Sequence, residues 1–208
     1  GANLKKHHAA AKDSSAAKQQ AEKQLATAQT ALAQAQTQLT NTKANVNELN
    51  ETQTKLLGEQ DANTAVLAKA TTQLPGLNEQ VGFLTRQLAS LREVQKQTDE
   101  KAKQDEAAAA LKAAAEKATE ATQAMNAALK AAKAQHDEAL ARTKSLPETI
   151  AAGQKKIEKT AAEITLAQAT QKTAQQQFNE RNSQIGAAQK NVKTTTDAAD
   201  AADKPIAA

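Results

Sequence analysis

The chain has 208 residues, a net charge of +4 from 27 basic and 23 acidic residues, and no Cys, Trp or Tyr. This balance excludes a polyelectrolyte tail, and the sequence lacks the aromatic residues that interleave with basic ones in single-strand nucleic-acid-binding proteins. No apolar run approaches the roughly 20 residues of a transmembrane helix, and without Cys there is no disulfide or thiolate site. Strong helix formers dominate while bulky core residues are scarce, so we expect an all-α, elongated coiled coil.

The first predicted helix covers about residues 3–73. Its apolar residues recur every seven positions, and a second set follows three positions later: Leu25, Leu32, Leu39 and Val46, then Ala28, Ala35, Thr42 and Leu49. This 3–4 spacing places two positions of each heptad on one face and is typical of a coiled coil. The eleven-residue step from Leu56 to Leu67 disturbs the heptad around Gly58, where we expect a stutter or a loop. We favour the stutter because no proline lies nearby.

The second predicted helix covers about residues 77–144. It begins after a break at Pro75, because proline inside a helix costs roughly 3 kcal/mol and Pro75-Gly76 is a turn dipeptide. Large apolar residues first keep the 3–4 spacing and then become sparse: Leu77, Val81, Leu84, Leu88 and Leu91, followed by Leu111, Met125 and Leu129. The apolar face is therefore thin over its second half.

The third predicted helix covers about residues 148–203. Ser145 and Glu148 fit a capping box, with Pro147 inside the first turn. One heptad register then runs through a series of large residues: Ile150, Ile157, Ile164, Phe178, Ile185 and Val192. Gln171 interrupts the series, either to fix the register of the helices or because it is partly exposed to solvent. Pro205 follows the last periodic residue and predicts an extended tail over residues 204–208.

These segments predict a single elongated helical domain over residues 1–208. Short connections at Leu74-Pro75 and Leu146-Pro147 make consecutive helices antiparallel. The expected architecture is therefore an up-down-up, three-helix coiled coil, with helices broken near Pro75 and Pro147. Alanine at the contact positions lets the helix backbones approach closely.

No residue pattern indicates catalysis, a cofactor or a metal. His7 and His8 are adjacent and point about 100° apart on a helix, and His136 has no acidic neighbour at i, i+4 spacing. Four acidic residues are close in sequence: Asp99, Glu100, Asp105 and Glu106. A thin helical bundle offers no concave pocket in which such carboxylates could act. We therefore expect a protein that is not an enzyme and has no catalytic, cofactor-binding or metal-binding residues.

Two stretches carry resemblances to known families. "LATAQTALAQAQTQLTNTKANV", residues 25–46, resembles the helical hairpin of periplasmic adaptor proteins in bacterial export pumps. The Ala-Gln-Lys-rich helices, with "LPETIAAGQKKIEKTAAE" and the closing "AADAADKPIAA", resemble the alanine-rich coiled-coil region of large exported bacterial proteins that joins cytochrome c-like and WD40 domains. This resemblance implies an exported or periplasmic protein with a folded domain after the helices. No haem-binding C-x-x-C-H occurs, so no redox role follows.

The function that fits best is a non-catalytic structural spacer, scaffold or interaction module within a larger multidomain protein. Its expected partners are other proteins or flanking domains of the same chain, with self-association through coiled-coil faces and no nucleic acid. One alternative is a desiccation-protectant-like helical protein, although the isoleucine heptads argue against a disordered chain. Another is an adaptor-like hairpin that contacts a membrane channel. The residues themselves assign no compartment.

Overall fold

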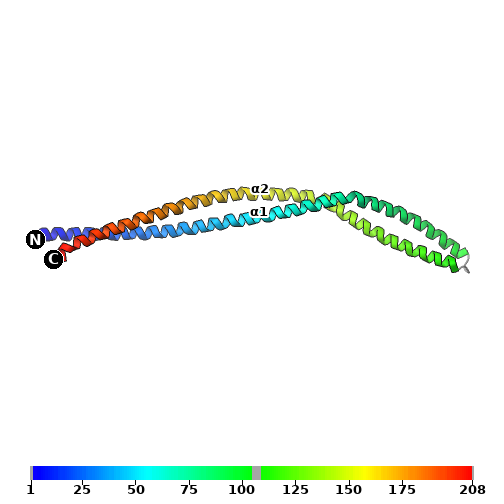
Figure 1. Cartoon of the computed structure of the whole chain (residues 1–208), viewed down its shortest axis with the longest axis horizontal. Coiled ribbons are helices and arrows are strands. Elements are labelled where there is room, and N and C mark those ends of the chain that lie inside the picture. The colour runs from blue at the N-terminus through cyan, green and yellow to red at the C-terminus, as the bar shows by residue number, and fades with distance from the viewer. Residues whose placement is uncertain (1, 105–108, 208) are drawn as a thin grey trace. The chain divides into compact units, whose positions relative to one another are not determined.

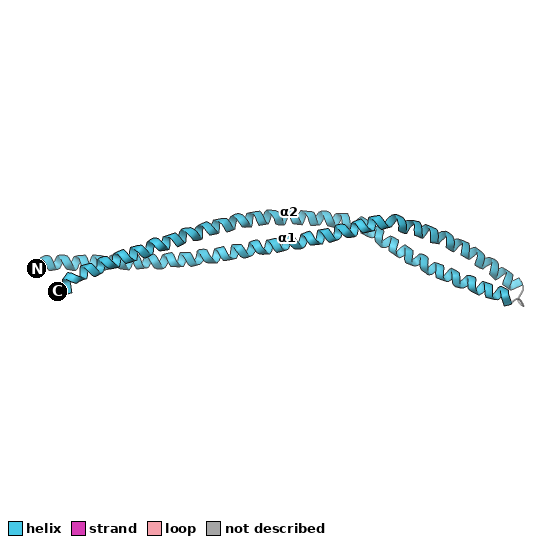
Figure 2. Cartoon of the chain, in the orientation of Figure 1, coloured by secondary structure: helices cyan, strands magenta, loops and turns pink. Residues whose placement is uncertain are grey.

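A computed structural model of the chain describes residues 2–104 and 109–207, with side chains described over 4–104 and 109–203 (Figure 1). Two helices account for these residues: α1, Ala2–Gln104, and α2, Ala109–Ala207. All of the described chain is helical (Figure 2). The prediction of an all-α coiled coil is confirmed, whereas the structure has two helices in place of the expected three.

Both internal prolines lie inside helices, so the predicted breaks near Pro75 and Pro147 are wrong. Their side chains are exposed, which places each ring on the solvent face of its helix. Each proline removes one backbone hydrogen bond, but water can reach the freed carbonyl on that face. The helix then continues, because stopping there would remove every later contact with the partner helix. Because the helix continues through Pro147, Ser145 also lies inside α2 and does not cap a helix.

The end of the chain also differs from the expectation. α2 continues to Ala207, where an extended tail over residues 204–208 was expected; Ala208 lies outside the described residues. Pro205 is close to the end of α2, so only one further backbone hydrogen bond is lost. The helix can therefore include Pro205 at a lower cost than a proline in the helix interior.

The chain forms two compact units, and each is a pair of helix segments. Unit 1 contains residues 1–54 and 158–208, and unit 2 contains residues 55–157. In each unit a stretch of α1 lies beside a stretch of α2 that runs in the opposite direction (Figure 1). That one domain spans residues 1–208, as the sequence suggests, stays a prediction.

The contact face of α1 keeps an unbroken heptad. Half-buried and buried residues follow 3–4 spacing from Ala11 to Ala102. The step from Leu56 to Leu67 contains two further members of this series, Gln60 and Asn63. The helix is continuous at Gly58, and the heptad passes through it without an inserted residue. The predicted stutter is therefore wrong, because polar residues occupy contact positions that a search for large apolar residues overlooks.

The contact face of α2 follows the same rule from Leu111 to Ala202, with exposed Arg181 as its gap. We call these two 3–4 series, one in each helix, the seam. Alanine supplies much of its deepest part: Ala21, Ala35, Ala70, Ala132, Ala139, Ala167, Ala174 and Ala199 are buried. The larger buried side chains are Leu39, Val46, Leu88, Leu129, Ile157 and Ile164. Small residues allow the two helices to pack closely, which compensates for the scarcity of bulky ones.

Candidate interaction surface

Polar side chains join the two helices at several levels. In unit 2 the Gln60 Nε2 donates to Gln154 Oε1 at 2.9 Å, and the Gln95 Nε2 donates to Thr119 Oγ1 at 3.1 Å. Between these two bonds α1 advances 35 residues and α2 retreats 35 residues. The register of the antiparallel pair is thus constant over five heptads of unit 2.

Further polar contacts lie beside the seam. The Arg92 Nη2 donates to Asn126 Oδ1 at 3.1 Å in unit 2. In unit 1 the Asn191 Nδ2 donates to Gln24 Oε1 at 3.4 Å. All four of these side chains are on exposed residues, so each bond competes with water and adds little stability.

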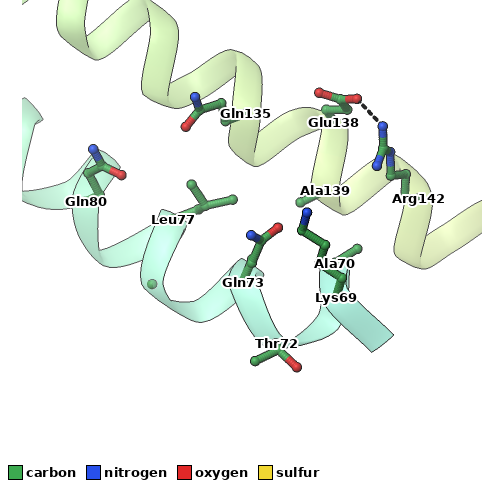
Figure 3. A pocket seen from close by; sticks show the side chains of 11 residues that line it. Lys69, Ala70, Thr72, Gln73, Leu77, Gln80, Gln135, Glu138, Ala139 and Arg142 are labelled. Atoms are coloured by element: carbon green, nitrogen blue, oxygen red, sulfur yellow. Dashed lines mark hydrogen bonds and ion pairs between the residues drawn. The ribbon is translucent and has the colours of Figure 1, made fainter. Parts of the chain in front are cut away.

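A groove of about 470 Å³ lies between α1 and α2 in unit 2. Figure 3 shows Gln73 and Leu77 pointing from α1 toward α2, while Thr72 points away from it. On the α2 side the Arg142 guanidinium donates to the Glu138 carboxylate. Lys69 also lines the groove, and no ion pair joins it to a carboxylate in the described part of the chain. The groove therefore offers amides and one unpaired cation to a partner.

Four large apolar side chains are exposed outside the seam on α1 in unit 2: Leu57, Val66, Phe83 and Val94. Phe83 is 53% exposed and Val94 is 47% exposed. They are eleven residues apart, which places them about 20° apart around the helix and hence on the same outer face. The sequence carried this signal, since neither residue falls on the heptad that contains Leu84, Leu88 and Leu91.

The middle of α1 in unit 1 presents a neutral surface. Residues 24–42 contain no charged side chain. Thr30 and Thr37 each donate their hydroxyl to the carbonyl four residues earlier, which leaves their methyl groups as the more prominent feature. A shallow groove of about 620 Å³ is lined by these two threonines and by neutral neighbours, including Ala33 and Asn41. This surface lies within the stretch that resembles the adaptor hairpin.

The polar residues considered from sequence do not form a reactive site. His7 and His8 are exposed on α1. His136 occupies a half-buried seam position, and its Nδ1 lies 3.2 Å from Asp137 Oδ1. Over the side chains that the structure describes, no three His, Asp or Glu residues gather as metal ligands. Asp99 is half-buried and Glu100 is exposed, while Asp105 and Glu106 lie outside the described residues. That the chain has no catalytic or ligand-binding residue stays a prediction.

Gln171 had two interpretations from sequence, a register-fixing residue or a partly exposed one. It is half-buried, and its side chain makes no hydrogen bond within the described ranges 4–104 and 109–203. The structure therefore favours partial exposure. The seam amides that bond across the two helices are Gln60 and Gln95, which the sequence reasoning did not single out.

Comparison with known proteins assigns no family to the chain. No protein-family model matches the chain. No curated protein matches it either. A coiled-coil segment of Smc from Pyrococcus yayanosii, known from a crystal structure, is similar to the chain with 13% identity and a TM-score of 0.41, over 98% of this chain and 92% of that one. Neither helix, over its described residues, is long and apolar enough to cross a membrane.

Proposed function

We propose that the chain is a non-catalytic helical spacer or scaffold within a larger protein. The observation that carries the proposal is the seam, which follows one 3–4 spacing from Ala11 to Ala102 in α1 and, apart from exposed Arg181, from Leu111 to Ala202 in α2. A continuous seam keeps two helices paired along their length, and helix length is fixed at 1.5 Å per residue. Such a pair is suited to holding other domains at a set distance.

The composition of the seam supports the same role. Alanine, threonine and isolated leucines or isoleucines fill much of it, and no described side chain of large volume is fully buried. A spacer needs a paired backbone of defined length, whereas an enzyme needs a concave site that excludes water. The role therefore depends on the length and register of the helix pair, and most outer residues do not contribute to it.

Matched heptad deletion tests the proposal. Removing residues 28–34 from α1 and residues 181–187 from α2 keeps the 3–4 spacing of both helices in unit 1. We expect an unchanged helical circular dichroism spectrum and a maximum dimension in small-angle scattering that is shorter by about 10.5 Å. Removing three residues from α1 alone is the control, because it rotates every later seam position off the contact face and should lower the melting midpoint strongly.

The spacer role itself is tested in the parent gene. An unrelated antiparallel coiled coil of equal length should replace this chain without loss of the parent protein's activity, while a shorter one should not. A reading frame that ends at Ala208 and has no domain before residue 1 would contradict the proposal, since nothing would then be spaced.

A second candidate is an adaptor-like hairpin that contacts a membrane channel or another protein. It is favoured by the two-helix, antiparallel arrangement and by the neutral, threonine-lined surface around Thr30 and Thr37. Thr30→Lys together with Thr37→Glu should abolish binding to such a partner and leave the fold intact. The replacement by an unrelated coiled coil separates the two candidates, because a partner-binding hairpin would lose its activity.

A further inference from the structure

The seam alone does not determine how α1 and α2 align. Because both series keep 3–4 spacing in unit 2, sliding one helix by seven residues places seam positions opposite one another again. Residues 83–146 contain neither Gly nor Pro, so the sequence has no residue of special backbone geometry between them to fix where α1 ends and α2 begins. Something else must select one register.

Gln60 has the geometry to do this. It occupies a seam position, and its amide nitrogen donates across to Gln154 at 2.9 Å. Its other amide atom, Oε1, is buried and has no hydrogen-bond partner. If the oxygen and nitrogen of the Gln60 and Gln154 amides are exchanged, Gln60 still makes one hydrogen bond to Gln154 and still has one buried polar atom without a partner. The single bond to Gln154 is thus the compensation that Gln60 receives in this register.

We propose that Gln60 sets the register of unit 2, because only the observed alignment gives its buried amide a partner. The residues seven before and seven after Gln154 in α2 are Pro147 and Ala161, and neither has a polar side chain. A slip of one heptad in either direction therefore replaces the polar side chain opposite Gln60 with an apolar one. A buried polar group without a partner is costly, so both slipped alignments are penalised.

Gln95 is the matched comparison within the same unit. It makes the equivalent bond, to Thr119, exactly five heptads further along α1. The residues seven before and seven after Thr119 are Lys112 and Asn126, which both carry polar side chains. A slipped alignment would still offer Gln95 a partner, so Gln95 does not discriminate between registers. Gln60 and Gln95 thus make equivalent bonds, but only Gln60 distinguishes the observed register from the slipped ones.

The test measures the alignment directly. The chain has no Cys, so Lys96→Cys and Lys144→Cys place spin labels at two exposed sites only, one on each helix. A slip of one heptad changes the axial separation of the labels by about 10.5 Å. Double electron–electron resonance should give one distance for the otherwise unchanged protein and for Gln95→Leu. Gln60→Leu should add populations displaced by about 10.5 Å while raising the melting midpoint.

A converse variant keeps Gln60 and offers it a wrong partner. Ala161→Gln supplies an amide one heptad beyond Gln154 and should add a population with a distance shorter by about 10.5 Å. Ala162→Gln, one residue away and exposed, should leave the distance unchanged. A single native distance in both Gln60→Leu and Ala161→Gln would overturn the inference, as would an equal displacement in Gln95→Leu.

Discussion

Unit 1 and unit 2 share the same heptad spacing, but within the described residues the seam amides that bond across to the partner helix lie in unit 2. Seam threonines in both units donate their hydroxyls to carbonyls of their own helix, as Thr42 and Thr195 do in unit 1 and Thr122 and Thr143 do in unit 2. In unit 2, Gln60 and Gln95 donate across to the partner helix. A threonine that bonds its own backbone is satisfied in any alignment, whereas an amide that bonds across is satisfied only in some. Threonine therefore keeps a seam narrow without specifying its register.

The two units also differ in regularity. Both internal prolines lie in unit 2, together with exposed Phe83 and Val94. Both units bury apolar seam residues, as Leu39 and Ile164 in unit 1 and Leu88 and Ala132 in unit 2 show, and unit 1 also exposes Leu166. We infer that both units depend on apolar packing, while unit 2 in addition accepts the local cost of two prolines and gains alignment from its amides.

The largest expected effect concerns the apolar seam of unit 1. Ile164→Asn places an unpaired amide at a buried position and should lower the free energy of unfolding by about 3 kcal/mol. Chemical denaturation followed by circular dichroism measures this. Lys159→Asn is the control, because its side chain is 78% exposed and its ion pair with Glu163 is a long one of 3.7 Å. Equal losses for the two variants would mean that Ile164 is not on the packed face.

The next prediction concerns the two prolines inside the helices of unit 2. Pro75→Ala and Pro147→Ala each restore a backbone hydrogen bond within a helix and should raise the free energy of unfolding by about 2 kcal/mol. Thr71→Ala, a nearby exposed change in α1, should alter it by less than about 0.5 kcal/mol. A loss of stability on replacing either proline would indicate that the residue begins a helix, as the sequence suggested.

Much of the coiled-coil pattern was predictable from sequence, because the series through Leu25 and Ile150 is dense enough to show its period. The positions of the helix ends were not. Proline is a strong local signal, yet Pro75 and Pro147 lie on solvent faces where continued pairing outweighs a cost of roughly 3 kcal/mol. α1 ends at Gln104 and α2 begins at Ala109, and the sequence has neither Gly nor Pro near these two ends.

The polar seam residues were harder still to interpret. Gln171 and Gln60 occupy comparable heptad positions, and only the alignment of the two helices shows which amide meets a partner. That alignment depends on where the chain reverses, which the sequence did not indicate. When only large apolar residues mark the seam, Gln60 and Asn63 are overlooked as seam positions. The heptad then appears to contain a stutter near Gly58.

A smaller effect compares glycines in the two units. A Cβ atom built at Gly58 in unit 2 or at Gly186 in unit 1 would meet nothing within 4 Å, and neither residue has a positive φ. Gly58→Ala and Gly186→Ala should each stabilise by about 0.5–1 kcal/mol, because alanine loses less backbone entropy in a helix. Equal gains measured by denaturation would show that both helices are regular at these points. No gain at Gly58 alone would restore the case for a local break there.

The smallest effect has the clearest sign. If Ser145 capped a helix, Ser145→Ala would cost about 1 kcal/mol by leaving a first-turn N–H unpaired. The structure places Ser145 within α2, where its carbonyl accepts a hydrogen bond from Thr149 Oγ1 at 3.2 Å. Alanine is the better residue in a helix interior, so we expect a gain of about 0.5 kcal/mol in the free energy of unfolding. Combining Ser145→Ala with Pro147→Ala sharpens the measurement, since in a continuous helix both changes stabilise. In a chain that starts a helix at this point both changes would destabilise, and the sum of the two effects lies well outside the error of denaturation.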